Sequence, residues 1–407
     1  MDTEYRLSAP VPLREPPAAP ALAALHTGVT AGTARRALGR ILGYLVVTRL
    51  TLYIVAACAI RLLPAAVQPP ADAYLGKSPT LAALVRWDAW WYLNIVERGY
   101  WLDAQHPSNV AFFPVFPLLV RGLAALTGNP LVAGLLVANA AAVAGVVGFW
   151  LWVREVAGEA AAERSVCWLL VFPFSFFFHT IYAESLFLAL VAFGFLAARR
   201  GHWAWAGVLG GLAAASRPLG VLLFPAFAWA LWEARRAGRA VRVRDLLSVL
   251  LVPAGLGAYA AYLWAAFGTP FASWDAHVAG WSVRFQWDLV GYWREARLML
   301  SHGPRVHSYT HLLDSLRIIL PLCFIVLTVG VFRRLGTAPG LFTAGAVTVA
   351  ILFAPESLGR EFLAAVPAFA VAGIVDRGGG TSEGLRLLSF GLLLVLLVAF
   401  ATAHFVG

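Results

Sequence analysis

Residues 130–152 read PLVAGLLVANAAAVAGVVGFWLW, without one charged side chain. A run of this length and apolarity is typical of a helix that crosses a bilayer, which takes about 20 residues. Further apolar runs occur at 41–60, 165–179, 184–198, 203–215, 219–232, 246–267, 316–332, 340–354, 362–375 and 385–405. The sequence therefore predicts an all-α polytopic membrane protein with about eleven transmembrane helices.

The composition supports a membrane protein and excludes other classes. Hydrophobic residues are 60% of the 407 residues and charged residues 13%, against roughly 25% charged in soluble proteins. Such hydrophobicity also excludes a disordered chain, apart from the Ala/Pro-rich residues 1–34, which we expect to form a disordered cytoplasmic tail. Residues 35–407 are expected to form a single transmembrane domain. Three cysteines lie inside apolar runs, where neither disulfides nor a metal site are expected.

Clusters of arginine between the apolar runs orient the predicted helices. They occur at 35–40, 154–164, 199–200, 235–244, 333–334 and 377–386. Because cytoplasmic loops are enriched in basic residues, this alternation predicts a cytoplasmic N-terminus. The net charge of +10 is therefore explained by membrane topology, and we expect no nucleic-acid partner.

Two long loops are expected on the extracytoplasmic side, at 61–129 and 268–315. Within the first, residues 112–127 are apolar but contain two prolines and an arginine. If this segment crossed the bilayer, every later arginine cluster would lie outside. We therefore expect it to be an amphipathic helix in the outer interface.

The most informative motif is Arg86–Tyr100, RWDAWWYLNIVERGY, in the first outer loop. In a helix, Asp88 shares one face with Trp91 and Tyr92, so a carboxylate lies in an aromatic wall. Such surroundings shift a carboxyl pKa towards that of a useful general base. The alternative is an interfacial anchor helix that Asp88 caps. The flanking candidates for substrate binding are Arg86 and Trp87.

Two other outer segments carry candidate binding residues. The segment Asn109–Pro117, NVAFFPVFP, has prolines that fix a bend and offers Asn109 and Phe113. A turn between two predicted spans offers Tyr182 and Glu184. Glu184 either lines the site or caps the following helix, where a carboxylate suits the helix dipole.

Arg217 and Arg360 are the candidate cations for a phosphate group. Each lies in a short predicted outer turn next to apolar runs. Arginine binds phosphate with two parallel hydrogen bonds, and an arginine at the membrane edge indicates function. The alternative is that each side chain reaches to the lipid headgroups.

The second long outer loop contains a weak metal-binding pattern. His307, His311 and Asp314 would share one helical face, although three-point patterns arise often by chance and a solvated loop is the simpler interpretation. We therefore expect no metal cofactor. The chain also lacks Asp-x-Asp, Walker A and Gly-x-Ser-x-Gly motifs, so no site for a soluble nucleotide is apparent. A sugar donor would have to arrive through the membrane.

Arg86–Tyr100 and Asn109–Pro117 resemble the first luminal loop of the PIG-V family, the GPI mannosyltransferases that add the second mannose. Weaker similarities occur in three later segments, in the same order along the chain as in the family. They lie at Tyr182–Ser185, Ser216–Gly220 and Ser357–Pro367. Together the similar segments extend over most of the chain.

The resemblance implies the GT-C glycosyltransferase fold, a multi-helix membrane bundle with a catalytic carboxylate in the first outer loop. It also implies a polyprenyl- or dolichyl-phosphate sugar donor, usually mannose, and inversion at the sugar carbon. Carried over to this sequence, the general base is Asp88. Many such enzymes have two acidic residues there, and whether Glu97, Glu184 or neither takes the second role stays open.

We therefore expect a mannosyltransferase that moves mannose from polyprenyl-phosphate-mannose to a hydroxyl of a lipid or glycan acceptor. The Ala-, Arg- and Leu-rich composition, with almost no lysine, suggests a high-GC bacterium and hence a site on the outer face of its cytoplasmic membrane. Since most bacteria make no GPI, the acceptor does not follow from the family. The alternatives are a lipid or sugar transporter, a structural subunit of a glycosylation complex, and a transferase of another sugar or onto a protein.

Overall fold

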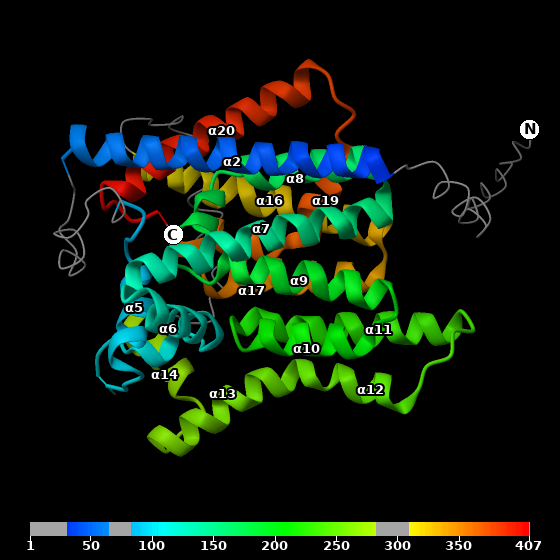
Figure 1. Ribbon diagram of the computed structural model, residues 1–407, viewed down its shortest axis with the longest axis horizontal. Coiled ribbons are helices and arrows are strands. Elements are labelled where there is room, and N and C mark those ends of the chain that lie inside the picture. Colours follow the sequence, from blue (N-terminus) through cyan, green and yellow to red (C-terminus); the bar gives the residue numbers. More distant parts are fainter. Residues whose placement is uncertain (1–30, 65–82, 104, 282–308, 407) are drawn as a thin grey trace, which may run out of the picture.

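The computed structural model describes residues 31–64, 83–103, 105–281 and 309–406, and within these ranges the chain is helical without a strand (Figure 1). The longest helices are α2 (Ala31–Leu62), α7 (Pro130–Ala157), α16 (Tyr309–Leu335) and α20 (Gly380–Ala401). Shorter helices between them are α8 (Glu159–Val171), α9 (Glu184–Arg199), α10 (Trp203–Ala214), α11 (Leu223–Arg236), α17 (Thr337–Phe353) and α19 (Val366–Val375). The second half also contains α12 (Val243–Val249) and α13 (Leu251–Phe267).

Four of the described helices, α2, α7, α16 and α20, are long and apolar enough to cross a membrane. The number rises to six if two bent pairs are each one span, α12 with α13 and residues 358–364 with α19. Each of the eleven predicted apolar runs overlaps a helix or such a pair, and the helices other than these are shorter. The prediction of an all-α, multi-pass membrane protein is confirmed.

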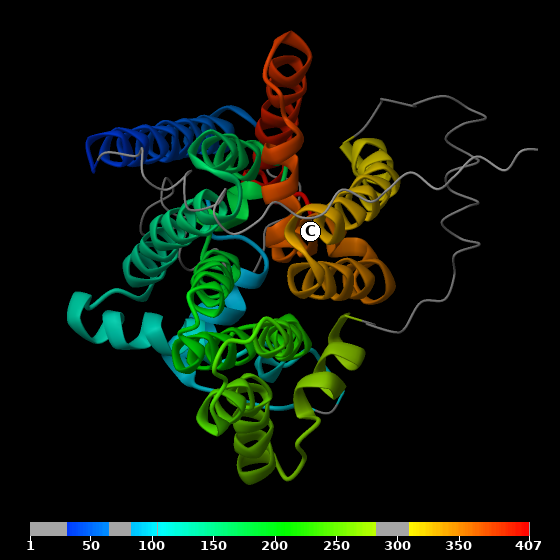
Figure 2. The ribbon, with the colours of Figure 1, turned by 90° about the vertical axis from the view of Figure 1, so that its right-hand side faces the viewer.

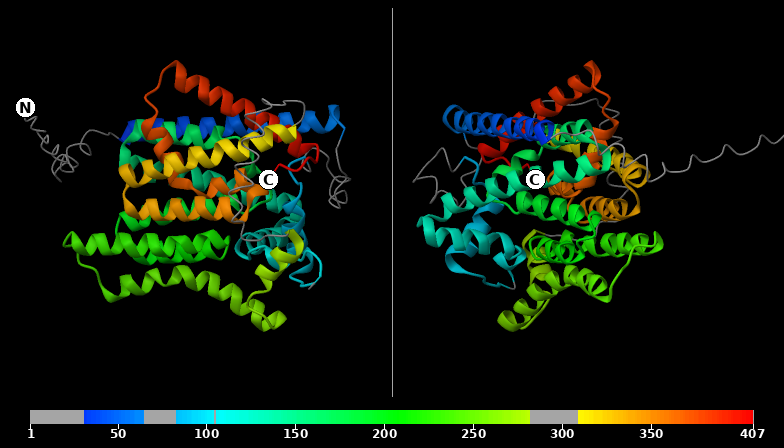
Figure 3. Two further views of the ribbon diagram at one scale, coloured as in Figure 1. Left: turned by 180° about the vertical axis from the view of Figure 1, so that it is seen from behind. Right: turned by 45° about the vertical axis from the view of Figure 1, so that its right-hand side comes forward.

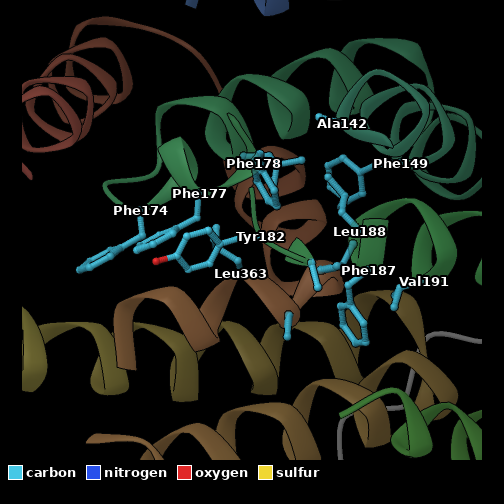
Figure 4. Close-up of a cluster of buried hydrophobic side chains, with 14 of the residues drawn as sticks. Ala142, Phe149, Phe174, Phe177, Phe178, Tyr182, Phe187, Leu188, Val191 and Leu363 are labelled. Atoms are coloured by element: carbon cyan, nitrogen blue, oxygen red, sulfur yellow. The ribbon is translucent and has the colours of Figure 1, made fainter. Parts of the chain in front are cut away.

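The helices lie side by side in one bundle, seen nearly end-on in Figure 2. Helix α7 packs along α9, α9 along α10, and α8 along α19. Between them is an aromatic core, with Phe149, Phe177, Phe178 and Phe187 almost inaccessible to solvent (Figure 4). This core supports the chain segments that carry the site.

Helix α8 is shorter than the apolar run at 165–179 suggested. It ends at Val171, and Phe172 has an extended conformation with φ −59° and ψ 138°. Pro173 follows, and the residue before a proline is disfavoured in the helical conformation. The chain continues as the short 3-10 helix η2 (Ser175–His179) before α9 begins. The turn between α8 and α9 is therefore inside the bundle.

The described parts of the two long predicted loops lie at one end of the bundle. Helices α5 (Asp88–Arg98), α6 (Val115–Thr127) and α14 (Ala272–Trp281) lie there with the 3-10 helix η1 (Asn109–Ala111) (Figures 1 and 3). Helix α9, with 16 residues, is about 24 Å long, whereas α7, with 28 residues, is about 42 Å. The short helices leave room for these elements at that end.

The side of the membrane assigned to the later arginine clusters depends on whether helix α6 crosses it. Its 13 residues extend about 20 Å, too short for an apolar core of about 30 Å. It ends at Gly128, whose φ is +67°, and Asn129 then caps α7 by accepting hydrogen bonds from two backbone N–H groups. The helix is thus too short to cross alone, as expected for 112–127.

Helices α10 and α13 approach closely through glycines, which gives a stability prediction. A Cβ added to Gly255 would lie 1.9 Å from the carbonyl oxygen of Gly211, whereas one added to Gly257 on the same helix would meet nothing within 4 Å. Gly255→Ala is therefore expected to force the helices apart, at a cost of about 1–3 kcal/mol or more. Thermal unfolding of the purified protein in detergent should show a clear drop in Tm for Gly255→Ala. Gly257→Ala is the matched control, and an equal Tm for both variants would contradict this packing.

Candidate active site

Asp88 is the first residue of α5, at the end of the bundle where the outer loops gather. The helix begins directly after Trp87. The carboxylate does not act as a helix cap in the structure but accepts a hydrogen bond from Nη1 of Arg360, 272 residues later in the chain. The side chain of Asp88 is 18% exposed. The interpretation of Asp88 as a mere cap is therefore not supported.

Arg360 and Arg217 join Asp88 to two further carboxylates in one charged network. Nε of Arg360 lies 3.6 Å from Glu184, and Nη1 of Arg217 lies 3.2 Å from the same carboxylate oxygen. Nη2 of Arg217 donates to Glu361 at 2.6 Å. The side chains of Glu184, Arg217, Arg360 and Glu361 are between 4% and 14% exposed. Both arginines are therefore buried and paired within the protein.

Each member of this network is placed by the end of a short helix. Glu184 opens α9, and Arg217 precedes the 3-10 helix η3 (Pro218–Leu222). Arg360 and Glu361 lie in α18 (Leu358–Glu361), after the 3-10 helix η4 (Pro355–Ser357) and before η5 (Phe362–Ala364). Because these helices end at one level of the bundle, residues far apart in sequence meet there.

Several buried polar atoms of the network lack a hydrogen-bond partner. They are Oε2 of Glu184, Nη1 of Arg217 and Nε of Arg360. Leaving a buried polar group unsatisfied costs about 1–3 kcal/mol, and more when it is charged. Nη1 of Arg217 and Nε of Arg360 still lie within ion-pair distance of Glu184, so charge attraction offsets part of this cost.

An aromatic wall borders Asp88, as the motif predicted. Trp91 stacks on Phe112 with ring centres 5.8 Å apart and meets Trp281 of α14 edge-on at 5.3 Å. Tyr92 is buried against Phe112 and Phe116, each at 5.1 Å. Trp90, Trp91 and Trp281 are only partly buried. Aromatic faces of this kind can hold the apolar face of a sugar ring or a lipid chain.

Two of the predicted binding residues support the loop and lie outside the charged network. Asn109 is fully buried and donates both amide hydrogens within the protein, to Asn94 and to the carbonyl oxygen of Gly99, each at 2.9 Å. Phe113 is buried against Tyr259 of α13, with ring centres 4.9 Å apart.

The other predicted residues surround the backbone of Asp88. Arg86 is buried and donates from Nε to the carbonyl oxygen of Ala401 at 3.1 Å. Trp87 donates from its indole nitrogen to the carbonyl oxygen of His404 at 3.3 Å. The hydroxyl of Tyr182 contacts the peptide groups on both sides of Trp87.

Of the three weak metal candidates, only the side chain of Asp314 lies in the part of the chain that the structure describes. His307 and the side chain of His311 lie outside the described residues. Asp314 pairs with Arg317 at 3.1 Å. Among the described residues, no group of three or more His, Cys, Asp or Glu side chains is placed to hold a metal ion.

Three residues of this region were not singled out from the sequence as site residues. Glu361 is the second carboxylate of Arg217, and its adjacency to Arg360 was the available signal. His277 and Trp281 lie one turn apart on α14, with ring centres 5.9 Å apart. Nδ1 of His277 donates to the carbonyl oxygen of Ser273 at 2.8 Å, and burial lowers the pKa of His277, so its ring is neutral at pH 7 with Nε2 as an acceptor. Their spacing in the sequence gave no indication that His277 and Trp281 belong to this region.

Two solved structures are similar to this chain at low sequence identity. The chain is 14% identical to ArnT from Cupriavidus metallidurans bound to undecaprenyl phosphate, with a TM-score of 0.50 over 86% of this chain and 63% of that one. It is 13% identical to the apo oligosaccharyltransferase of Archaeoglobus fulgidus, with a TM-score of 0.47 over 89% of this chain and 56% of that one. The chain thus spans less than two thirds of either protein. No curated protein matches its sequence.

The family comparison agrees with the arrangement of the site. The family described as Mannosyltransferase (PIG-V) matches residues 36–283, which is more than half of the chain. That match includes α5 with Asp88, the start of α9 with Glu184, and Arg217. The chain therefore belongs to the PIG-V mannosyltransferase family of membrane glycosyltransferases with the GT-C fold.

Proposed function

We propose that this protein transfers mannose from polyprenyl-phosphate-mannose to a hydroxyl group of a lipid or glycan acceptor, with inversion at the anomeric carbon. The observation that carries the proposal is the buried network in which Asp88 shares Arg360 with Glu184. It combines a candidate base with two guanidinium groups that match a lipid phosphate. The fold neighbour from Cupriavidus metallidurans was solved with undecaprenyl phosphate, a ligand of the proposed donor class.

In the proposed reaction, Asp88 accepts the proton of the acceptor hydroxyl. The acceptor oxygen forms a bond to the anomeric carbon while the bond from that carbon to the phosphate oxygen breaks. The electron pair leaves with the lipid phosphate. General base catalysis of this kind contributes about 10²–10⁴-fold, and alignment of both substrates contributes more.

Arg360 links the base to the leaving group. In the structure its guanidinium group is paired with Asp88, so the carboxylate is engaged by Arg360. A donor phosphate that binds Arg360 and Arg217 competes with Asp88 for the guanidinium group and releases the carboxylate. When Asp88 takes the proton it becomes neutral, and both arginines can then stabilise the charge that develops on the leaving phosphate.

The net charge of the network is compatible with proton uptake by Asp88 as the phosphate leaves. Asp88, Glu184 and Glu361 are three carboxylates against the two guanidinium groups of Arg217 and Arg360. Proton uptake by Asp88 removes one negative charge as the phosphate gains one. The reaction thus moves charge within the site without adding to it.

We place this chemistry on the extracytoplasmic face of a bacterial cytoplasmic membrane. The opposite end of the bundle carries arginine side chains that pair with acidic ones, such as Arg200 with Glu155 at 2.5 Å and Arg154 with Glu159 at 3.8 Å. Basic residues mark the cytoplasmic side, which puts the N-terminus inside and Asp88 outside. Membrane lipids, the lipid-linked donor and the acceptor are the expected partners.

A transfer assay in membranes from cells that express the chain tests this function. Radiolabelled polyprenyl-phosphate-mannose is supplied with a total lipid and glycan extract as acceptor, and polyprenyl-phosphate-glucose serves as the sugar control. We expect label to appear in an acceptor product with the mannose donor and only in membranes that contain the protein. Equal or greater transfer from the glucose donor would contradict mannose, and loss of donor without a labelled acceptor would contradict transfer.

A further inference from the structure

Trp87, directly before Asp88, has an unusual backbone conformation. Its φ is +54° and its ψ −115°, and only one other non-glycine residue in the described ranges, Ala403, has a positive φ. A bulky residue in such a region is strained and persists only where surrounding contacts hold it. The peptide that carries Asp88 is therefore held by contacts outside α5.

The first of these contacts is the hydroxyl of Tyr182, from the turn before α9. It accepts a hydrogen bond from the backbone N–H of Asp88 at 3.1 Å and donates one to the carbonyl oxygen of Arg86 at 3.0 Å. One hydroxyl thus joins the peptide groups on both sides of Trp87. The ring is 1% exposed and lies beside Phe177, with ring centres 5.0 Å apart (Figure 4). Its position is fixed by the aromatic core.

The second set of contacts comes from residues 401–406 at the end of α20, here called the brace. The carbonyl oxygens of Ala401 and His404 accept hydrogen bonds from Nε of Arg86 and the indole of Trp87. The ring of Phe405 meets the indole of Trp87 edge-on at 5.3 Å. The brace therefore holds both residues that precede Asp88.

The brace itself is ordered by local contacts. Ala403, with φ +64°, reverses the chain after α20, and it is fully buried. The hydroxyl of Thr402 donates to the carbonyl oxygen of Val398 at 2.8 Å and lies 3.0 Å from Nδ1 of the His404 ring. Val406 is buried as well. These contacts fix the carbonyl oxygen that Trp87 uses.

We propose that Tyr182 and the brace are positioning elements that set the carboxylate of Asp88 against its substrates by holding Trp87 in its strained conformation. The proposal rests on the proposed function, in which Asp88 is the base. Tyr182, Trp87 and Phe405 then act through the backbone of Asp88 and need no contact with the donor. Their loss should lower kcat and leave the KM for the lipid donor unchanged.

Conservative variants of the purified enzyme in detergent or liposomes test this role. Tyr182→Phe removes only the hydroxyl, and Trp87→Phe removes the pyrrole ring with its N–H while it keeps a smaller aromatic ring. We expect each to lower kcat about 10- to 100-fold, because a shift of about 1 Å in a reacting group costs about 10²-fold. The donor KM should stay within about twofold. Tyr44→Phe, on the exposed face of α2, is the matched control and should behave like the wild type.

A double-mutant cycle separates positioning from a general structural effect. Asp88→Glu lengthens the base by one methylene, and its cost should be large when the backbone is held and smaller in the Tyr182→Phe background. Losses that simply multiply, at an unchanged Tm, would contradict positioning, as would wild-type kcat in both conservative variants. Asp88→Asn is assayed in parallel. If that variant keeps its activity, the proposed base is wrong; if it is inactive while Tyr182→Phe is fully active, only the positioning role fails.

Discussion

Asp88→Asn is expected to lower kcat by about 10²–10⁴-fold, the contribution of a general base. The amide has nearly the same shape as the carboxylate, so it still fills the space beside Arg360, but it cannot accept the proton of the acceptor hydroxyl. The donor KM should not rise, because both arginines remain and the neutral amide competes less than the carboxylate with the phosphate for Arg360. Initial rates of mannose transfer at saturating donor, with purified protein in liposomes, measure this effect.

The matched control for this prediction is Asp275→Asn. Asp275 is exposed on α14 at the same end of the bundle. The control should keep wild-type rates, and the Tm of both variants should stay close to that of the wild type. A rate for Asp88→Asn within a few-fold of the wild type would show that Asp88 is not the base.

Arg360→Gln has the second large expected effect, a fall in kcat of about 10²–10³-fold, as for removal of a group that stabilises transition-state charge. Arg360 contacts both Asp88 and Glu184, so its loss removes the proposed contact to the leaving phosphate and the link to the base. Arg360→Lys keeps the charge without the planar fork and should be intermediate. The measurement is kcat and donor KM for both variants.

Arg317→Gln is the control for the arginine variants. Arg317 lies on α16 and pairs with Asp314 three residues earlier, and its side chain is 31% exposed. It should leave kcat and KM unchanged. If Arg360→Gln matched this control, the phosphate would have to bind elsewhere in the site.

The helices and the place of Asp88 on α5 were predictable because their signals are local. An apolar run such as 130–152 predicts a spanning helix by its length alone, and α7 covers it from Pro130 to Ala157. The face shared by Asp88, Trp91 and Tyr92 follows from helical periodicity once the segment is helical. Both predictions need no knowledge of the rest of the chain.

The charged network was only partly predictable because its contacts join distant segments. Glu184, Arg217 and Arg360 were candidates from their positions near predicted span ends, but nothing local paired Arg360 with Asp88 or Arg217 with Glu361. The structure distinguishes the two candidates for a second acidic residue by their positions. Glu184 lies in the network, whereas Glu97 is exposed near the other end of α5.

The most direct test of the account is the anomeric configuration of the product formed by the purified, reconstituted protein from polyprenyl-phosphate-mannose of defined configuration. Transfer by direct attack, with Asp88 as base, predicts a product of the opposite configuration from the wild type and no product above background from Asp88→Asn. A product of retained configuration, or undiminished transfer by Asp88→Asn, would contradict the proposed mechanism.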